Sequence, residues 1–108
     1  MEAIETLRGM LDDHGPRYLE SQRAFEAGAV CLMGVPYDGT TSFRPGTRFG
    51  PSALRAASVG LETYSPELDQ DYAGRAVVDL GDLEVSHGAA SPVMAQVRDA
   101  VRLILDAD

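Results

Sequence analysis

A continuous apolar run at residues 29–35 constrains the fold of this chain more than any other segment. It reads Ala-Val-Cys-Leu-Met-Gly-Val and lies between Gly28 and Pro36. A strand with one solvated face alternates apolar and polar residues, whereas this run is apolar throughout. The pattern therefore predicts a short strand buried on both faces, as in a parallel sheet covered by helices.

The rest of the chain alternates between predicted helices and one further strand. Apolar spacing and breaker residues predict helices at 3–13, 51–61 and 92–105, and a strand at 76–80 that is stopped by Gly81-Asp82. Pro51 and Pro92 suit the first turns of the second and third helices, where a missing N–H costs nothing. The order strand, helix, strand, helix indicates an α/β fold with parallel strands and right-handed crossovers. Two strands are marginal on their own, so the chain is interpreted as the beginning of a larger sheet.

Each predicted helix has an apolar face that we expect to be buried. The expected buried residues are Ile4, Leu7 and Leu11; Leu54, Ala57 and Leu61; and Val93, Val97, Val101 and Ile104. Residues 62–75, which include the acidic group Glu67, Asp69 and Asp71, are polar and are predicted to be a solvated surface excursion.

Composition narrows the possible partners and compartments. The formal net charge of -8 disfavours nucleic acid and anionic membranes, because their phosphates would be repelled. The single cysteine, Cys31, excludes an intramolecular disulfide and is expected to be an inert core residue in a reducing cytoplasm. No apolar run approaches the roughly 20 residues of a membrane span, and the N-terminus has no signal-peptide pattern.

Residues 36–50 form the segment that carries functional information. Proline and glycine recur through it, which predicts a long structured loop between a strand and a helix. Ligands in open α/β sheets gather at the carboxyl ends of strands, where this loop begins. Arg44 and Arg48 can bind carboxylates, and Asp38 can pair with an arginine or with a cationic ligand. The alternative is that these three residues form ion pairs that only hold the loop in shape.

Three segments of the chain resemble a known family. Residues 34–38 read Gly-Val-Pro-Tyr-Asp, residues 44–55 have the form R-x-G-x-R-x-G-P-x-A-L-R, and residues 77–82 end in D-x-G-D. These segments resemble the opening strand, loop, helix and second strand of ureohydrolases, and the second motif is most similar to the agmatinase branch. The resemblance implies an incomplete arginase-like α/β/α domain at 28–108, with residues 1–27 as a variable N-terminal extension.

The same resemblance implies an activity. Ureohydrolases use two manganese ions and a bridging hydroxide to hydrolyse a guanidino C–N bond, because the metals lower the pKa of the bound water. For the agmatinase branch the expected reaction is agmatine to putrescine and urea, in polyamine biosynthesis, by a cytoplasmic enzyme that is a homo-oligomer when intact. The family's metal ligands lie in G-G-D-H, D-A-H-x-D and D-x-D segments, and none of these occurs in this sequence. We therefore assign no catalytic or metal residue here and expect the chain alone to be inactive.

The resemblance also gives the loop a role. Asp38, Ser42, Arg44 and Arg48 become candidates for a substrate loop near the active-site mouth or a subunit interface. Two other interpretations remain open: a non-catalytic truncated chain or interaction module without the metal site, and an unrelated small α/β binding protein.

The other polar residues have weaker functional interpretations. His14 and His87 are expected to be surface or locally hydrogen-bonded residues, since neither has a second ligand at metal spacing. Asp79 and Asp82 are too few to hold a hard cation, and loop or helix-cap hydrogen bonds are favoured for them.

Overall fold

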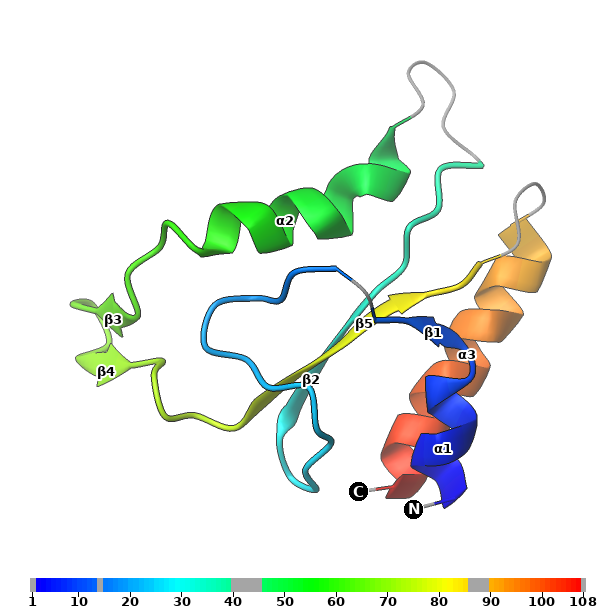
Figure 1. Cartoon of the computed structure of the whole chain (residues 1–108), viewed down its shortest axis with the longest axis horizontal. Helices are drawn as coiled ribbons and strands as arrows, with labels where there is room; N and C mark the ends of the chain where they lie inside the picture. Colours follow the sequence, from blue (N-terminus) through cyan, green and yellow to red (C-terminus); the bar gives the residue numbers. More distant parts are fainter. Residues whose placement is uncertain (1, 14, 40–45, 86–89, 108) are drawn as a thin grey trace.

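The computed structural model describes residues 2–13, 15–39, 46–85 and 90–107 (Figure 1). Its elements in chain order are α1 (Glu2–Arg8), β1 (Leu11–Asp12), β2 (Val30–Gly34), the 3-10 turn η1 (Thr47–Phe49), α2 (Gly50–Ser58), β3 (Tyr64–Ser65), β4 (Gln70–Asp71), β5 (Val77–Leu83) and α3 (Ala90–Ala107). The predicted alternation of strands and helices is confirmed, and the helix predicted to start near Pro51 does so.

The central sheet has the order β1-β5-β2. β2 is parallel to β5, as expected, with Cys31 opposite Val78. The prediction that this strand is buried on both faces was wrong, because Val30 is exposed and the other residues of β2 are only partly buried. β1 is antiparallel to β5, so the sheet is mixed. The prediction of one helix through residue 13 was wrong, because α1 ends at Arg8 and the next residues pair with β5. An open strand edge satisfies the main-chain N–H and C=O groups of these residues better than continued helix, since the last carbonyls of a helix lack partners.

β5 continues through the glycine that was predicted to stop it. Gly81 has φ +88°, a conformation that L side chains rarely adopt, and a Cβ atom there would lie 2.5 Å from the carbonyl oxygen of Asp12. Glycine therefore allows β1 to approach β5 while the strand extends to Leu83. The register between β2 and β5 shifts between Leu32 and Gly34, beside this glycine.

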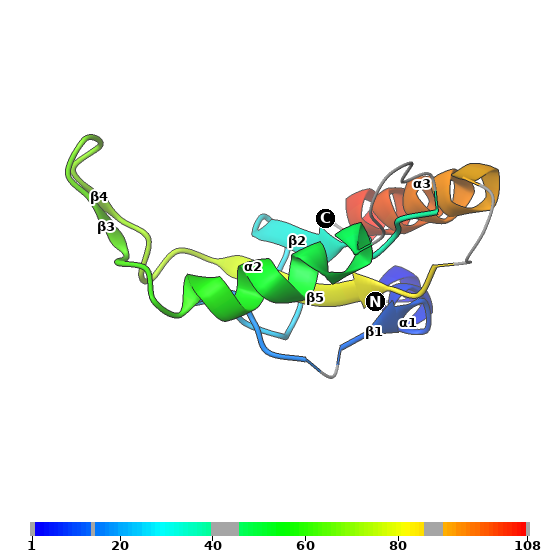
Figure 2. The ribbon, with the colours of Figure 1, turned by 90° about the horizontal axis from the view of Figure 1, so that it is seen from above.

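The hydrophobic core lies on one face of the sheet, under α1 and α3. The two helices pack beside each other and bring both ends of the chain together (Figures 1 and 2). The buried core residues are Ile4, Leu7, Leu11, Val78, Leu80, Leu83 and Ala100. Ile4, Leu7 and Leu11, from the predicted N-terminal extension, thus supply part of the core.

The buried side of α3 differs from the predicted one, and Val97 and Ile104 are only partly buried. Val93 is buried as expected, but Val101 is 42% exposed and Ala100 is fully buried in its place. Periodicity favoured the larger valine, whereas close packing against the core favours the small alanine at the buried position.

α2 lies on the opposite side of the strands from α1 and α3, which makes three layers (Figure 1). Its expected apolar stripe was wrong. Leu54 and Leu61 are 60% and 67% exposed, and the buried residues of the helix are Arg55 and Ser58.

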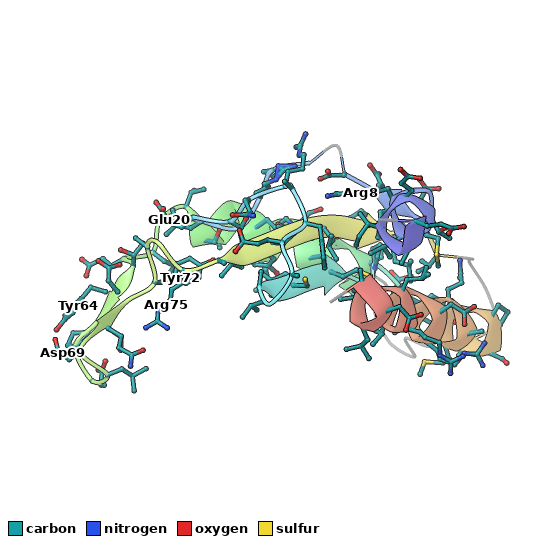
Figure 3. The ribbon with its side chains drawn as sticks, turned by 90° about the horizontal axis from the view of Figure 1, so that it is seen from below. Arg8, Glu20, Tyr64, Asp69, Tyr72 and Arg75 are labelled. Carbon is teal, nitrogen blue, oxygen red and sulfur yellow. The ribbon has the colours of Figure 1, made fainter. Side chains whose placement is uncertain are left out.

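The β3–β4 hairpin extends away from the sheet, as expected for a surface excursion (Figure 2). Figure 3 shows Tyr64 and Asp69 at its outer end, where the phenol donates a 2.6 Å hydrogen bond to the carboxylate. Glu67, Asp69 and Asp71 are exposed. No helix in the described part of the chain is both long and apolar enough to cross a bilayer.

Candidate functional site

A buried ion cluster joins α2 to the central strand. Arg55 donates from Nε to Oδ2 of Asp79 at 2.8 Å and from Nη2 to Oδ1 of the same residue at 3.0 Å. Its Nη1 donates to Oδ1 of Asp82 at 2.5 Å, and its Nη2 also reaches the carbonyl of Gly81 at 3.1 Å. Arg55 is 4% exposed and Asp79 is 1% exposed, so this fork-on-fork pair is removed from water.

Main-chain groups satisfy the rest of Asp79. Its carboxylate accepts hydrogen bonds from the N–H groups of Tyr18 and Gly81, each at 3.0 Å. The ring of Tyr18 lies 5.4 Å from the Arg55 guanidinium carbon. The cluster therefore connects α2, β5 and the segment before β2, and buried charges of this kind are stable only when so fully paired.

Electrostatics keep both members of the pair charged. Burial alone raises the pKa of Asp79, but the Arg55 hydrogen bonds and the two N–H groups outweigh burial, and the pKa is lowered from its usual value. Burial alone lowers the pKa of Arg55, but the hydrogen bonds and charges of Asp79 and Asp82 raise it above its ordinary value. The cluster is thus an ion pair at neutral pH.

These contacts revise the interpretation of the D-x-G-D segment. Asp79 does accept loop N–H groups, but its main partner and that of Asp82 is Arg55, to which the sequence pattern assigns no role. The sequence does contain a feature that indicates this pairing: α2 has one long charged residue among small and apolar ones, and β5 has two aspartates near its end. It could not be interpreted without knowing that α2 crosses β5.

The ends of the loop between β2 and η1 are fixed by Asp38. Its Oδ2 accepts a hydrogen bond from the N–H of Gly46 at 2.8 Å, and its Oδ1 lies 3.6 Å from Nη1 of Arg48. Arg48 is partly exposed and also lies over the Phe49 ring at 4.9 Å from its centroid. The structure brings Asp38 and Arg48 together as the loop-holding alternative expects, while Ser42 and Arg44 lie outside the described residues.

A groove of about 400 Å³ opens at the carboxyl edge of the sheet, beside this loop. Its lining residues are Asp12, Pro36, Arg48, Phe49, Asp82, Leu83, Glu84 and Val85. Three carboxylates and one guanidinium give it an acidic character, which suits a cationic ligand. No group of three or more His, Cys, Asp or Glu side chains in the described ranges is arranged to hold a metal ion. His14 and His87 lie outside those ranges.

A sequence model of the arginase family matches residues 28–108. The chain belongs to the arginase family. It is similar to an agmatinase from Bacillus cereus, with 39% identity over 87% of this chain and 32% of that protein. It is also similar to the N(1)-aminopropylagmatine ureohydrolase of Thermococcus kodakarensis, with 40% identity over 70% of this chain and 26% of that protein.

A crystal structure of a proposed agmatinase from Clostridium difficile shares the fold. It is 43% identical, with a TM-score of 0.66 over 71% of this arginase-family chain and 28% of that one. The predicted membership and the incomplete arginase-like α/β fold are confirmed. The chain spans about a quarter to a third of the length of the curated relatives it matches, a share that fits the N-terminal portion of a ureohydrolase.

Proposed function

We propose that this chain is part of an agmatinase-like ureohydrolase that hydrolyses a guanidino C–N bond, with agmatine giving putrescine and urea as the expected reaction. The observation that carries the proposal is the family match over residues 28–108 together with 39% identity to an agmatinase. A relative named N(1)-aminopropylagmatine ureohydrolase is 40% identical, so the aminopropyl derivative of agmatine is a second candidate substrate.

The acidic groove at the carboxyl edge supports a guanidino substrate. Agmatine is cationic, and Asp12 and Glu84 line the groove beside Asp82, whose charge is already balanced by Arg55. The loop that begins at Pro36 borders the groove, and Asp38 holds its two ends together. In this proposal Asp38, Ser42, Arg44 and Arg48 belong to the mouth of the active site or to a subunit interface of a homo-oligomer. Their role is to shape the entrance and not to perform the chemistry.

The two manganese ions expected of the family do not fit the described residues. Among those, the carboxylates nearest the groove are paired with cations or spread along its wall, and no ligand cluster forms. We therefore assign no metal ligand to the described residues of this chain. The residues of this chain contribute the fold and one wall of the approach to the site.

Urea release tests the proposal directly. Incubated with agmatine and Mn²⁺, the 108-residue chain should release no more urea than a metal-only blank, because its sequence contains none of the family's metal-ligand segments. A longer product that carries G-G-D-H and D-A-H-x-D segments in addition to these residues should release urea in proportion to enzyme. An extended product that binds Mn²⁺ but leaves agmatine and its aminopropyl derivative intact would contradict the proposed activity. An extended product that binds no Mn²⁺ would favour the non-catalytic alternative.

A further inference from the structure

Three arginine side chains converge on one aspartate in the segment that precedes β2. Oδ1 of Asp13 accepts a 2.9 Å hydrogen bond from Nη2 of Arg17. Its Oδ2 lies 3.3 Å from Nε of Arg23 and 3.7 Å from Nη1 of Arg8. We call these four residues the arginine cluster. Figure 3 shows Arg8 beside α1.

The main chain holds the arginine cluster in place. Asp13 follows β1 directly, and β1 is paired with the end of β5. The segment bearing Arg17 and Arg23 is pinned to the same edge of β5 at Gln22, whose N–H donates to Val77 at 2.8 Å. Arg8 also donates from Nη2 to the carbonyl of Arg23 at 2.6 Å. The guanidinium groups are therefore presented by a folded frame and not by free chain.

The arginine cluster has more positive charge than Asp13 can balance. Three guanidinium groups against one carboxylate leave a formal surplus of two positive charges, in a chain whose net charge is -8. Within the described part of the chain, Nε of Arg17 is buried and has no hydrogen-bond partner. A buried donor without an acceptor is unfavourable, so the cluster is short of acceptor atoms.

The cluster also remains open to solvent. The side chains of Arg8, Arg17 and Arg23 are 31%, 19% and 57% exposed, and that of Asp13 is 24% exposed. Planar guanidinium groups bind carboxylates and phosphates through paired N–H donors. Additional oxygen atoms can therefore reach the exposed N–H groups of these guanidinium groups from solvent, but not the buried Nε of Arg17.

We propose that the arginine cluster binds a small dianionic oxyanion, either a phosphate or a dicarboxylate. The ligand supplies the acceptor atoms that Asp13 lacks, and its two negative charges match the surplus. Asp13 keeps the three guanidinium groups together when no ligand is bound, and its charge weakens the binding of a second anion at the same place. The site lies outside residues 28–108 that match the family and is independent of the groove at the carboxyl edge.

Titration calorimetry of the 108-residue chain tests this site. One series uses inorganic phosphate, one uses succinate, and sodium chloride at matched ionic strength is the reference, because salt screens exposed charges. At least one dianion should bind, and the tighter one identifies the ligand class. Arg23→Gln should weaken that binding about tenfold or more, as expected for one charge-assisted hydrogen bond. The matched control Arg98→Gln removes an exposed arginine on α3 and should leave binding unchanged.

Asp13→Asn separates a ligand site from a purely structural ion network. Loss of the internal carboxylate raises the surplus charge, so the dianion should bind more tightly to this variant than to the parent chain. A structural network would instead lose stability without any change in dianion affinity. The proposal is overturned if neither dianion binds, if Arg23→Gln binds as the parent does, or if Asp13→Asn binds no more tightly.

Discussion

Arg55 holds more of the tertiary structure together than any apolar residue of its helix. Its guanidinium donates to two carboxylates and a carbonyl, and both Asp79 and the arginine are almost completely buried. Desolvation of the two charges opposes the formation of such a pair. Removal of one member lowers the stability of the fold even more, because the other charge then stays buried without a partner.

Arg55→Met should therefore destabilise the chain by about 3–5 kcal/mol, the usual cost of an uncompensated buried charge. The matched variant Arg98→Met removes an arginine whose side chain is 62% exposed, and it should change stability by less than about 0.5 kcal/mol. Urea denaturation followed by circular dichroism measures both. Equal effects of the two substitutions would contradict the buried ion pair.

Acid should weaken the same cluster. The pKa of Asp79 is lower in the folded chain than its ordinary value, since Arg55 and two N–H groups outweigh the effect of burial. The stability that this carboxylate contributes is therefore present above its unfolded-state pKa of about 3.9 and is lost as the pH falls through the lower folded-state pKa. Unfolding free energies measured from pH 6 to pH 2 should fall less steeply for Asp79→Asn than for the parent chain. Parallel profiles would show that other carboxylates control acid unfolding.

Each helix makes a different use of its sequence. α1 and α3 bury apolar residues against the sheet as amphipathic helices do, whereas α2 buries Arg55 and Ser58 and leaves Leu54 exposed. Ser58 explains the second contact of α2, because its hydroxyl accepts a hydrogen bond from the N–H of Leu19 at 3.0 Å. An apolar stripe on a helix therefore does not identify its buried side when carboxylates and main-chain N–H groups lie opposite another side of the helix.

The packing of α3 can be tested at two neighbouring positions. Ala100→Leu adds volume where the side chain is fully buried, and it should cost about 1–3 kcal/mol through overpacking. Val101→Leu enlarges a residue that is 42% exposed and should change stability by less than about 0.5 kcal/mol. Thermal unfolding distinguishes them, since about 1 kcal/mol moves the midpoint of a domain this size by roughly 4–8 °C. A larger loss of stability for Val101→Leu than for Ala100→Leu would support the valine stripe predicted from periodicity.

At the scale of the whole molecule, much apolar surface is open. β2 pairs on one side only within the described sheet, and Val30 at its start is 60% exposed. A hollow of about 380 Å³ lies between this strand and the β3–β4 hairpin, lined in part by Leu32, Leu68 and Tyr72. Open strand edges and apolar patches favour association with other chains, and the charge of -8 opposes it.

The isolated chain should accordingly be marginally stable and should self-associate as its concentration rises. Whole domains are stable by only about 5–15 kcal/mol, and each large side chain left unburied forgoes roughly 1.5–3 kcal/mol. Sedimentation velocity over a concentration series, with thermal unfolding, measures both properties. A monodisperse monomer with a cooperative transition above about 60 °C would contradict the prediction.

Local sequence determined the features that depend on neighbouring residues. The apolar run at 29–35 became β2, Gly50-Pro51 began α2, and prolines and glycines kept 36–46 free of a long helix or strand in its described parts. The motifs around this loop were also sufficient to identify the family, because they lie close together in the chain. Main-chain preferences and helix start signals act within a few residues, so they can be recognised without a fold.

Only the tertiary structure decided which distant groups meet. Arg55 and Asp79 are 24 residues apart in the chain, and their pairing depends on α2 crossing the sheet on the side opposite α1. The pairing of β1 with β5, and the approach of Arg8 and Arg23 to Asp13, depend in the same way on where the N-terminal segment runs. The spacing of charged residues along the sequence does not predict which of them will pair. The partner is whichever opposite charge the packed layers bring within reach, where loss of water makes the pairing necessary.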